Sequence, residues 1–517
     1  MRESLRQAMA WLHTWLGLTF GWLLFAIFLT GTLSYFKEEI SHWAHPELRV
    51  RPLDTRAALD RAEAYLRQAA PGAATWYLMP PDERQPGLEV MWAGAPGSGK
   101  RFVSKLLDPA TGQEALTRDS RGGDFFYRFH YELELGFPWG RWLASLAAMA
   151  MLVALVSGII THKKIFKEFF TFRPGKGQRS WLDGHNAVAV LALPFHLMIT
   201  YSGLVIFMAM LLPATLATVY KGEPAAFYQE VFPNAFPGPA KGEAGAPLGL
   251  ASLYDRAMMR WPGARLSRVE VQHPGDAAER VVFYRHGGDR IAYLPGNSLA
   301  FDGVSGALLE TSVPDGGALL IAGGFYGLHM GQFANGVERW LYFIFGLGGT
   351  AMIGTGLVLW VSKRQLKHAR EPRLPFGLRM VGVLNMASMA GLPLAVGAFF
   401  WANRLLPLQL EHRGGWEVRV FFLTWLALLI HALLRQGRRG WLEQLSLGAA
   451  LYLGLPLLGI FTTERGLPVA IAQGDWATAG VDLTALACGL ALLWLLRKVA
   501  LRGALPTVGS QPAKVPS

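Results

Sequence analysis

Long runs of apolar residues constrain this chain more than any other feature of its sequence. Apolar residues fill 52% of the 517 positions, and several runs exceed the roughly 18 to 20 residues that cross a bilayer core of about 30 Å. The sequence therefore predicts a mainly α-helical integral membrane protein with about eight transmembrane helices. The predicted spans are residues 14–36, 142–162, 184–212, 340–362, 380–402, 418–434, 444–462 and 477–496.

Basic residues in the short connections predict the orientation of these spans. Lys and Arg cluster after spans two, four, six and eight, whereas the connections at 403–417 and 463–476 hold few basic residues. Because Lys and Arg collect on the cytoplasmic side, we expect a multi-pass protein with both termini cytoplasmic. The net charge of +12 then reflects topology, so the expected partner is the lipid bilayer and no nucleic acid.

Two external segments share one plan. Each begins with a helical stretch, at 55–69 and at 252–260, and continues with alternating residues that predict short antiparallel strands. The strands are expected near 74–79, 88–92 and 101–107 in the first segment, and near 268–272, 280–284 and 291–294 in the second.

A unit of span, small α+β domain and span therefore occurs twice, which predicts an internal duplication of the first four-helix unit as parallel repeats. The last four spans form a separate module. The predicted parts are helix one at 1–36, the first external domain at 37–139, helices two and three with a basic loop at 140–212, the second external domain at 213–338, helix four at 339–366, the C-terminal four-helix module at 378–500, and a cytoplasmic tail at 501–517.

A histidine recurs at the same offset in both halves of the duplicated region. His13 stands seventeen residues before Thr30-Gly31, and His185 stands seventeen residues before Ser202-Gly203. At about 1.5 Å of rise per residue, both lie within a turn or two of the cytoplasmic boundary. Small residues such as Thr30-Gly31, which recur near the opposite ends of spans, fit a close approach of helices with room for a flat macrocycle, or helix packing alone.

A second histidine recurs on the external side. His130 ends Phe-Tyr-Arg-Phe-His, and His329 ends Phe-Tyr-Gly-Leu-His, each shortly before an Arg-Trp pair that opens the next apolar run. Imidazole is the usual axial ligand of b-type haem, and polar side chains in or beside spans face the bundle interior. The doubled spacing predicts two haem irons, one held by His13 and His185 inside, and one held by His130 and His329 outside.

Two further histidines leave alternatives open. His162 ends span two and could replace an inner ligand, or be an interfacial residue beside lysines. His196 lies eleven residues past His185, about 16 Å deeper, and could serve a haem nearer the membrane centre or find another buried partner. Haem propionates could pair with several basic residues, namely Arg128, Arg141 and Arg339 outside, and Lys164 and Arg179 inside.

Several residue types and motifs are missing from the sequence, and their absence restricts the type of haem and the class of protein that we expect. Cys488 is the single cysteine, so no Cys-x-x-Cys-His motif exists and the haem would be non-covalent, as haem b. The centres of spans one to seven carry no Asp, Glu, Lys or Arg, which disfavours a proton-coupled carrier. No Gly-rich dinucleotide motif is present. Electrons are therefore expected from a separate donor, a membrane quinol or a cytoplasmic reductase.

Taken together, these motifs resemble the PepSY-associated transmembrane family, which includes bacterial inner-membrane reductases of ferric siderophores. The resemblance covers roughly residues 6–366. It implies two periplasmic PepSY-like domains, an inner-membrane location, and reduction of a ferric siderophore or another periplasmic iron complex by this haem-dependent oxidoreductase. The residues that carry it are Leu12-His13-x-Trp15-Leu16-Gly17 with Thr30-Gly31, Asp108 to Gly112, His130 with Leu133, His162-Lys163-Lys164, His185 with Ser202-Gly203, and Leu328 to Gly331 with Thr355-Gly356 and Trp360.

A non-redox membrane protein is the competing expectation. It would use the two small domains to restrain a peptidase, or act as part of a siderophore or peptide permease, and would need no matched histidines. For the redox protein, aromatic residues would shape the acceptor site or anchor the chain at the interface. They are Phe125, Phe126, Tyr127, Phe325 and Tyr326.

Overall fold

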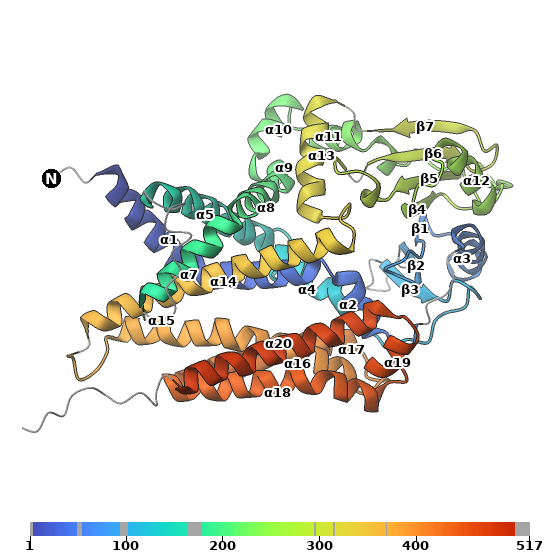
Figure 1. The fold of residues 1–517 in the computed structure, drawn as a ribbon. Coiled ribbons are helices and arrows are strands. Elements are labelled where there is room, and N and C mark those ends of the chain that lie inside the picture. The colour runs from blue at the N-terminus through green and yellow to red at the C-terminus, as the bar shows by residue number, and fades with distance from the viewer. Residues whose placement is uncertain are drawn as a thin grey trace, which may run out of the picture. The chain divides into compact units, whose positions relative to one another are not determined.

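The structure is a computed structural model, and the chain divides into two compact units. The first unit comprises Met1–Arg118 and Gly122–Gly356, and the second comprises Asp119–Arg121 and Leu357–Ser517. Figure 1 shows the helices and strands of both units. The residues described are 4–48, 54–93, 102–162, 178–293, 296–313, 316–368 and 370–501.

Helices dominate both units, and the spans expected from the sequence are present as long apolar helices. Within the described residues, seven helices are long and apolar enough to cross a membrane, or eight if one bent pair is a single span. The chain is therefore a multi-pass membrane protein. The seven are α1 (Leu5–Ser34), α5 (Trp139–Thr161), α14 (Gly336–Lys367), the stretch Phe376–Leu405, α17 (Arg413–Leu434), α18 (Arg438–Thr462) and α20 (Trp476–Leu501).

The third span is bent, whereas the sequence predicted a continuous helix over 184–212. Helix α7 (Gln178–Leu191) ends before Ala192, and α8 (Leu193–Ile206) leaves at 67° to it. The proline ring at Pro194 occupies the first turn of α8, where its missing N–H costs nothing, but it would clash with the preceding turn of a straight helix. The bend therefore follows from a residue within the apolar run.

Both outer histidines lie on short helices that connect the external segments to the spans. Helix α4 (Gly122–Glu132) carries His130 and packs against α1 and against α2 (Lys37–Ala44). Helix α13 (Gly317–Met330) carries His329 and packs against α8. The first unit also contains α9 (Met208–Leu211), α10 (Pro213–Val219) and α11 (Pro224–Val231).

The strands of the two external segments form one antiparallel sheet, in the order β3-β2-β1-β4-β5-β6-β7. The first segment supplies three strands and the second supplies four, and β1 pairs with β4 so that Tyr77 lies opposite Glu270. The strands are β1 (Thr75–Met79), β2 (Leu88–Ala93), β3 (Phe102–Leu107), β4 (Leu266–Gln272), β5 (Arg280–Arg285), β6 (Ser298–Asp302) and β7 (Leu308–Ser312).

One strand prediction for the second segment was wrong, and two strands of that segment were not predicted. The expected strand at 291–294 is irregular through Tyr293, and Leu294 lies outside the described residues. The third strand is β6, whose apolar residues pair with β5, and β7 was not predicted. Local alternation alone did not separate a strand from an extended loop here.

One face of the sheet is covered by the two predicted helices, now α3 (Thr55–Ala69) and α12 (Leu250–Arg260). Alternate residues of the central strands, such as Leu78 on β1 and Val269 on β4, are fully buried in the core that includes both helices. Because successive strand residues point to opposite faces, the residues between them face away from the helices.

A buried ion pair lies at the start of α17 in the C-terminal unit. Arg413 and Glu417 are both 0% exposed, and Glu417 also accepts hydrogen bonds from Asn403 and from Ser120. A π-helical turn (Ala387–Gly391) joins α15 (Phe376–Met386) to α16 (Leu392–Leu405), and α19 (Leu467–Ala472) precedes α20.

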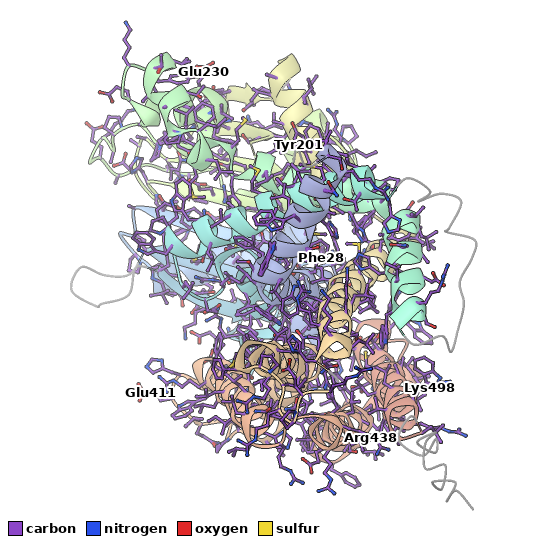
Figure 2. All side chains as sticks on the ribbon, turned by 90° about the vertical axis from the view of Figure 1, so that its left-hand side faces the viewer. Phe28, Tyr201, Glu230, Glu411, Arg438 and Lys498 are labelled. Carbon is purple, nitrogen blue, oxygen red and sulfur yellow. The ribbon has the colours of Figure 1, made fainter. Side chains whose placement is uncertain are left out.

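Two predicted cytoplasmic connections of this unit lie together. Arg438 donates hydrogen bonds to the carbonyl groups of Val499 and Ala500, next to Lys498. Figure 2 labels Arg438 and Lys498 on this unit. Within the first unit, Arg6 donates to the carbonyl of Thr161 at 2.8 Å, so the start of α1 and the end of α5 also share one side. Both contacts agree with the alternating directions expected of successive spans.

The pairing of β1 with β4 can be tested by cross-linking. In a Cys488→Ala background, cysteines replacing Tyr77 and Glu270 should form a disulfide, because directly opposed Cα atoms lie about 4.5–5.5 Å apart. Cysteines replacing Met91 and Glu270 are the matched control, because two strand spacings separate them by about 9–10 Å. Mass spectrometry of the oxidised protein should detect only the first cross-link; equal yields would contradict a single sheet.

Candidate functional site

The structure brings His13 and His185 together. His13 lies on α1 and His185 on α7, and their ring centroids are 6.4 Å apart with the ring planes at 76°. In the sequence, both histidines stand seventeen residues before a pair of small residues. We call them the inner pair.

The structure also brings His130 and His329 together. His130 on α4 and His329 on α13 have ring centroids 6.1 Å apart, with the planes at 32°. We call them the outer pair. Both pairs have the spacing of two imidazoles on one metal ion, because opposed metal–nitrogen bonds of about 2.0 Å put the ring centres roughly 6 Å apart.

Each of the four rings is fixed by a hydrogen bond at Nδ1. Three of them bond a backbone carbonyl, which can only accept, so Nδ1 carries the proton. In the fourth, Ser202 Oγ already donates to the carbonyl of Met198, so its oxygen accepts from His329. The bonds are His13 to Ala154 O at 2.8 Å, His130 to Ile27 O at 2.8 Å, His185 to Met352 O at 2.9 Å and His329 to Ser202 Oγ at 3.0 Å.

A glycine lies against each ring. A Cβ at Gly31 would stand 2.6 Å from His130 Nδ1, closer than real Cβ contacts allow, and the other three glycines would place one within 3.3 Å of a ring atom. Each of these glycines follows a Ser or Thr in the sequence, giving the pairs Thr30-Gly31, Ser157-Gly158, Ser202-Gly203 and Thr355-Gly356. The contacts are Gly158 with His13, Gly31 with His130, Gly356 with His185 and Gly203 with His329.

Because Nδ1 carries the proton in each ring, Nε2 carries the lone pair. Within the described residues, no hydrogen bond reaches Nε2 of any of the four histidines. A neutral imidazole whose Nδ1–H donates to a carbonyl is the form that binds a metal through Nε2. These hydrogen bonds thus set the tautomer and the orientation of four potential ligands.

The two pairs lie at opposite ends of the spans. On α1, His13 belongs to the inner pair, and Gly31 supports the outer pair eighteen residues later, which corresponds to about 27 Å of helix. The two pairs are therefore separated along α1 by nearly the thickness of a bilayer core.

His162 and His196 take different places. His162 follows the end of α5 and lies close enough to His13 and His185 to interact electrostatically with both. His196 is fully buried against Phe28 and Phe195, with Nε2 3.3 Å from the carbonyl of Phe345. Among the described residues, no second histidine ring contacts His196, and its Nδ1 has no hydrogen-bond partner. Figure 2 labels Phe28 among the side chains of the first unit.

A cavity of about 330 Å³ adjoins the outer pair and is lined by His130, His329, Gly31 and Gly203. Its walls are mainly apolar, with Phe28, Phe195 and Met151 among them. Three basic side chains, Lys37, Arg84 and Arg141, also line it, together with the single acid Glu38. The described lining therefore contains three cations and one carboxylate.

The cations of this lining are held by ion pairs. Arg141 bonds Glu132 at 2.7 Å, and Lys37 bonds Glu38 at 2.8 Å and Asp124 at 3.2 Å. Burial alone would lower the pKa of Lys37, but these two carboxylates outweigh it and raise the pKa above its usual value. Lys37 therefore stays charged at neutral pH.

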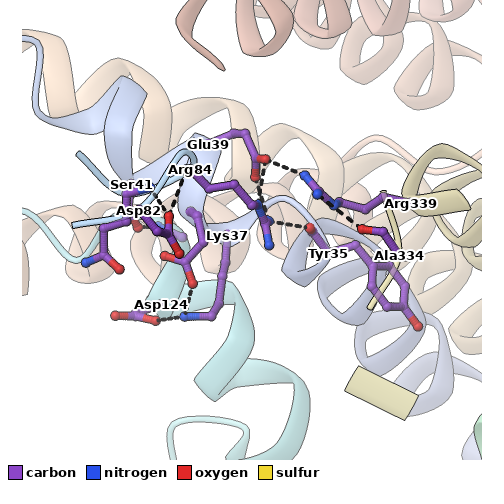
Figure 3. Close-up of polar contacts among 12 residues, drawn as sticks. Tyr35, Lys37, Glu39, Ser41, Asp82, Arg84, Asp124, Ala334 and Arg339 are labelled. Atoms are coloured by element: carbon purple, nitrogen blue, oxygen red, sulfur yellow. Dashed lines mark hydrogen bonds and ion pairs between the residues drawn. The ribbon is translucent and has the colours of Figure 1, made fainter. Parts of the chain in front are cut away.

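Arg84 reaches the cavity from the β1–β2 hairpin. It forms a bidentate pair with Glu39, at 2.9 Å and 2.8 Å, and donates to the carbonyl of Tyr35 at 3.0 Å. Arg339 binds the same Glu39 at 2.6 Å, and Figure 3 shows the two guanidinium groups converging on this carboxylate. The hairpin of the external segment is thus tied to α2 and α14 beside the outer pair.

Of the basic residues expected near haem propionates, only some lie at a histidine pair. Arg141 lines the outer cavity, whereas Arg128 is half-exposed and pairs with Glu132. Arg339 reaches Glu39 instead, Arg179 is exposed, and Lys164 lies outside the described residues. Among the expected aromatics, Tyr127 and Tyr326 line the cavity, Phe125 and Phe126 are fully buried, and Phe325 packs against Tyr201.

Sequence reasoning missed Lys37 and Arg84. Neither had a signal in its local sequence, since Arg84 reaches the cavity only through the long-range position of its hairpin. It also missed Ser145 and Thr200, which line the cavity and whose hydroxyl groups are buried without a hydrogen-bond partner among the described residues. Within those residues, no group of three or more His, Cys, Asp or Glu is placed to hold a metal ion.

Comparison with known proteins gives two findings. The family model described as the PepSY-associated TM region matches residues 10–363. The uncharacterized protein PA4219 of Pseudomonas aeruginosa is 28% identical over 405 residues, which cover 74% of this chain and 98% of that protein.

Substituting one of the four glycines that contact a histidine ring tests this contact. Gly31→Ala should lower stability by about 1–3 kcal/mol, because the new methyl group overlaps the His130 ring. Gly17→Ala on the same helix is the control: nothing lies within 4 Å of its Cβ, and alanine is the better helix former. Scanning fluorimetry should show a lower apparent Tm for Gly31→Ala alone, and equal values for both variants would refute the contact.

Proposed function

Because the chain belongs to the PepSY-associated transmembrane family, we propose that it binds two b-type haems and carries electrons across the membrane. His13 and His185 would hold the inner haem iron, and His130 and His329 the outer one. The proposal rests on the distances between ring centroids, 6.4 Å in the inner pair and 6.1 Å in the outer pair. In addition, all four Nδ1 atoms are fixed by hydrogen bonds. Bound haem would supply the one-electron chemistry.

The donor set favours haem over a bare metal ion. Each pair offers two imidazoles, and in the described parts of the chain no group of three ligands forms. Zinc in proteins takes three or four protein ligands, whereas haem iron needs only axial ligands from the protein.

Charge around the outer cavity supports the same proposal. The two propionates of a haem require cations or hydrogen-bond donors when they are partly buried. Lys37, Arg84 and Arg141 would hold them, and the hydroxyl groups of Ser145 and Thr200 could donate further hydrogen bonds.

The matched contacts of the two halves support an internal duplication with two PepSY-like domains. Each half places one histidine on a span and one on a short helix, and seats each on a glycine of a neighbouring helix. Each half also contributes a helix followed by antiparallel strands. With the basic connections inside, this gives a bacterial inner-membrane protein with cytoplasmic termini and a periplasmic sheet.

Electrons would enter near the inner pair from a quinol or a cytoplasmic donor and leave from the outer pair. About 27 Å of α1 separates the two sites, and the rings of Phe28, Phe195 and His196 lie between helices in this interval. The expected acceptor is a ferric siderophore. One electron converts its Fe³⁺ to Fe²⁺, which binds hard oxygen ligands less tightly and is released.

Haem content tests the proposal. Purified protein from haem-replete cells should show a Soret band, and a pyridine haemochrome assay should give two haems b per chain. His130→Ala and His13→Ala should each lose about one haem, because each removes one axial ligand from one pair. His412→Ala is the control, since that side chain is 79% exposed. A colourless protein would favour the non-redox alternative, and loss of both haems or neither would refute the pairing.

A charge substitution tests the outer cavity. Arg141→Gln should lower the reduction potential of one haem by tens of millivolts, roughly, because it removes a cation that stabilises the reduced form. Arg128→Gln is the matched control: Arg128 pairs with the same Glu132 but does not line the cavity. A redox titration in which both variants shift equally would contradict this role of Arg141.

A further inference from the structure

The face of the sheet that α3 and α12 leave uncovered contains a second cavity, of about 490 Å³. It lies on strands from both external segments, and the residues that line it alternate with those of the helix-covered core. The lining is largely aromatic and thioether in character. It consists of Tyr77, Met79, Met91, Phe102, Ser267, Arg268, Tyr284 and Tyr293.

A single arginine lies among these rings. The guanidinium of Arg268 is 4.2 Å from the centre of the Tyr284 ring and 5.9 Å from that of Tyr77. Its Nη2 approaches Glu270 at 3.5 Å, and its buried Nε has no hydrogen-bond partner in the described residues. A cation flanked by ring faces, with one donor unused, can bind an anion that also stacks.

The neighbouring phenol stays neutral. Burial, and then the nearby Glu270, raises the pKa of Tyr284 to about 12. At neutral pH its ring therefore adds an apolar face and no negative charge that would repel an anion.

This cavity is connected to the outer pair through two tyrosines. The rings of Tyr293 and Tyr326 are 6.2 Å apart, and Tyr326 lies three residues before His329 on α13 and lines the outer cavity. The loop that carries Tyr293 is tightly packed on α13: the Tyr293 N–H donates to the carbonyl of Gly323 at 3.0 Å, and a Cβ at Gly327 would overlap the carbonyl of Ile291. The rings of Tyr293 and Tyr326 would thus lie between a molecule bound on the sheet and the outer pair.

We propose that this cavity binds the ferric acceptor, and that the chelator is one whose iron-binding oxygens are catecholates or phenolates. The inference rests on the proposed function and adds the substrate class to it. Aryl chelate arms would stack on Tyr77 and Phe102, and the negative complex would pair with Arg268. A hydroxamate chelate lacks aryl faces and would gain less from this lining.

Calorimetric titration of the purified full-length protein with gallium(III) complexes tests binding without redox chemistry. The probes are a synthetic tricatecholate and a linear trihydroxamate, each loaded with gallium(III). Arg268→Gln should weaken tricatecholate binding roughly tenfold, and Phe102→Ser, at an exposed position, should weaken it by a smaller factor. Arg285→Gln is the matched control, because this arginine lies over the ring of Trp261, which packs against the helix-covered core.

The inference is overturned if Arg268→Gln and Phe102→Ser bind the tricatecholate as the unsubstituted protein does. It is equally overturned if the trihydroxamate binds as tightly, or if neither complex binds. Those outcomes leave the haem content unaffected, so the two-haem proposal would stand. Conversely, Arg268-dependent binding to a protein that contains no haem would support the acceptor site and refute the redox function.

Discussion

The hydrogen bond between each imidazole Nδ1–H and a neighbouring helix is the interaction on which the rest of this structure depends. A glycine on the neighbouring helix leaves room for each ring: a Cβ at Gly31 would overlap the His130 ring, and one at Gly158 would lie 3.1 Å from the His13 ring. The bond fixes the tautomer, and the glycine fixes the position. Since the same arrangement occurs four times, the helices of the first unit approach one another at the histidines.

Other features of the first unit follow from keeping these rings in place. The bend at Pro194 lets α7 present His185 to one helix while α8 offers Gly203 to another. The short helices α4 and α13 bring His130 and His329 to the spans from the external side. Above them, Glu39 binds Arg84 and Arg339, so the β1–β2 hairpin is attached to the helices that surround the outer pair (Figure 3).

The sequence was sufficient to predict most of the long apolar helices and the grouping of the four histidines, because apolar runs and repeated offsets are properties of the linear chain. The pairing of His13 with His185 and of His130 with His329 followed from symmetry. The single sheet could not be predicted, since β1 and β4 are about 190 residues apart along the chain and alternation does not identify a partner strand. Arg84 and Arg268 were missed for the same reason: only the fold brings them to a cavity.

The proposal that each histidine pair holds one haem iron is tested most directly by electron paramagnetic resonance of the oxidised protein at low temperature. Two haems, each held by two imidazoles, should give two low-spin ferric signals. Because the angle between the axial rings sets the anisotropy of such a signal, the inner pair at 76° and the outer pair at 32° should differ. The inner signal should be the more anisotropic, and it should disappear in His13→Ala. High-spin haem alone, or no haem signal, would show that the histidine pairs do not hold two haems.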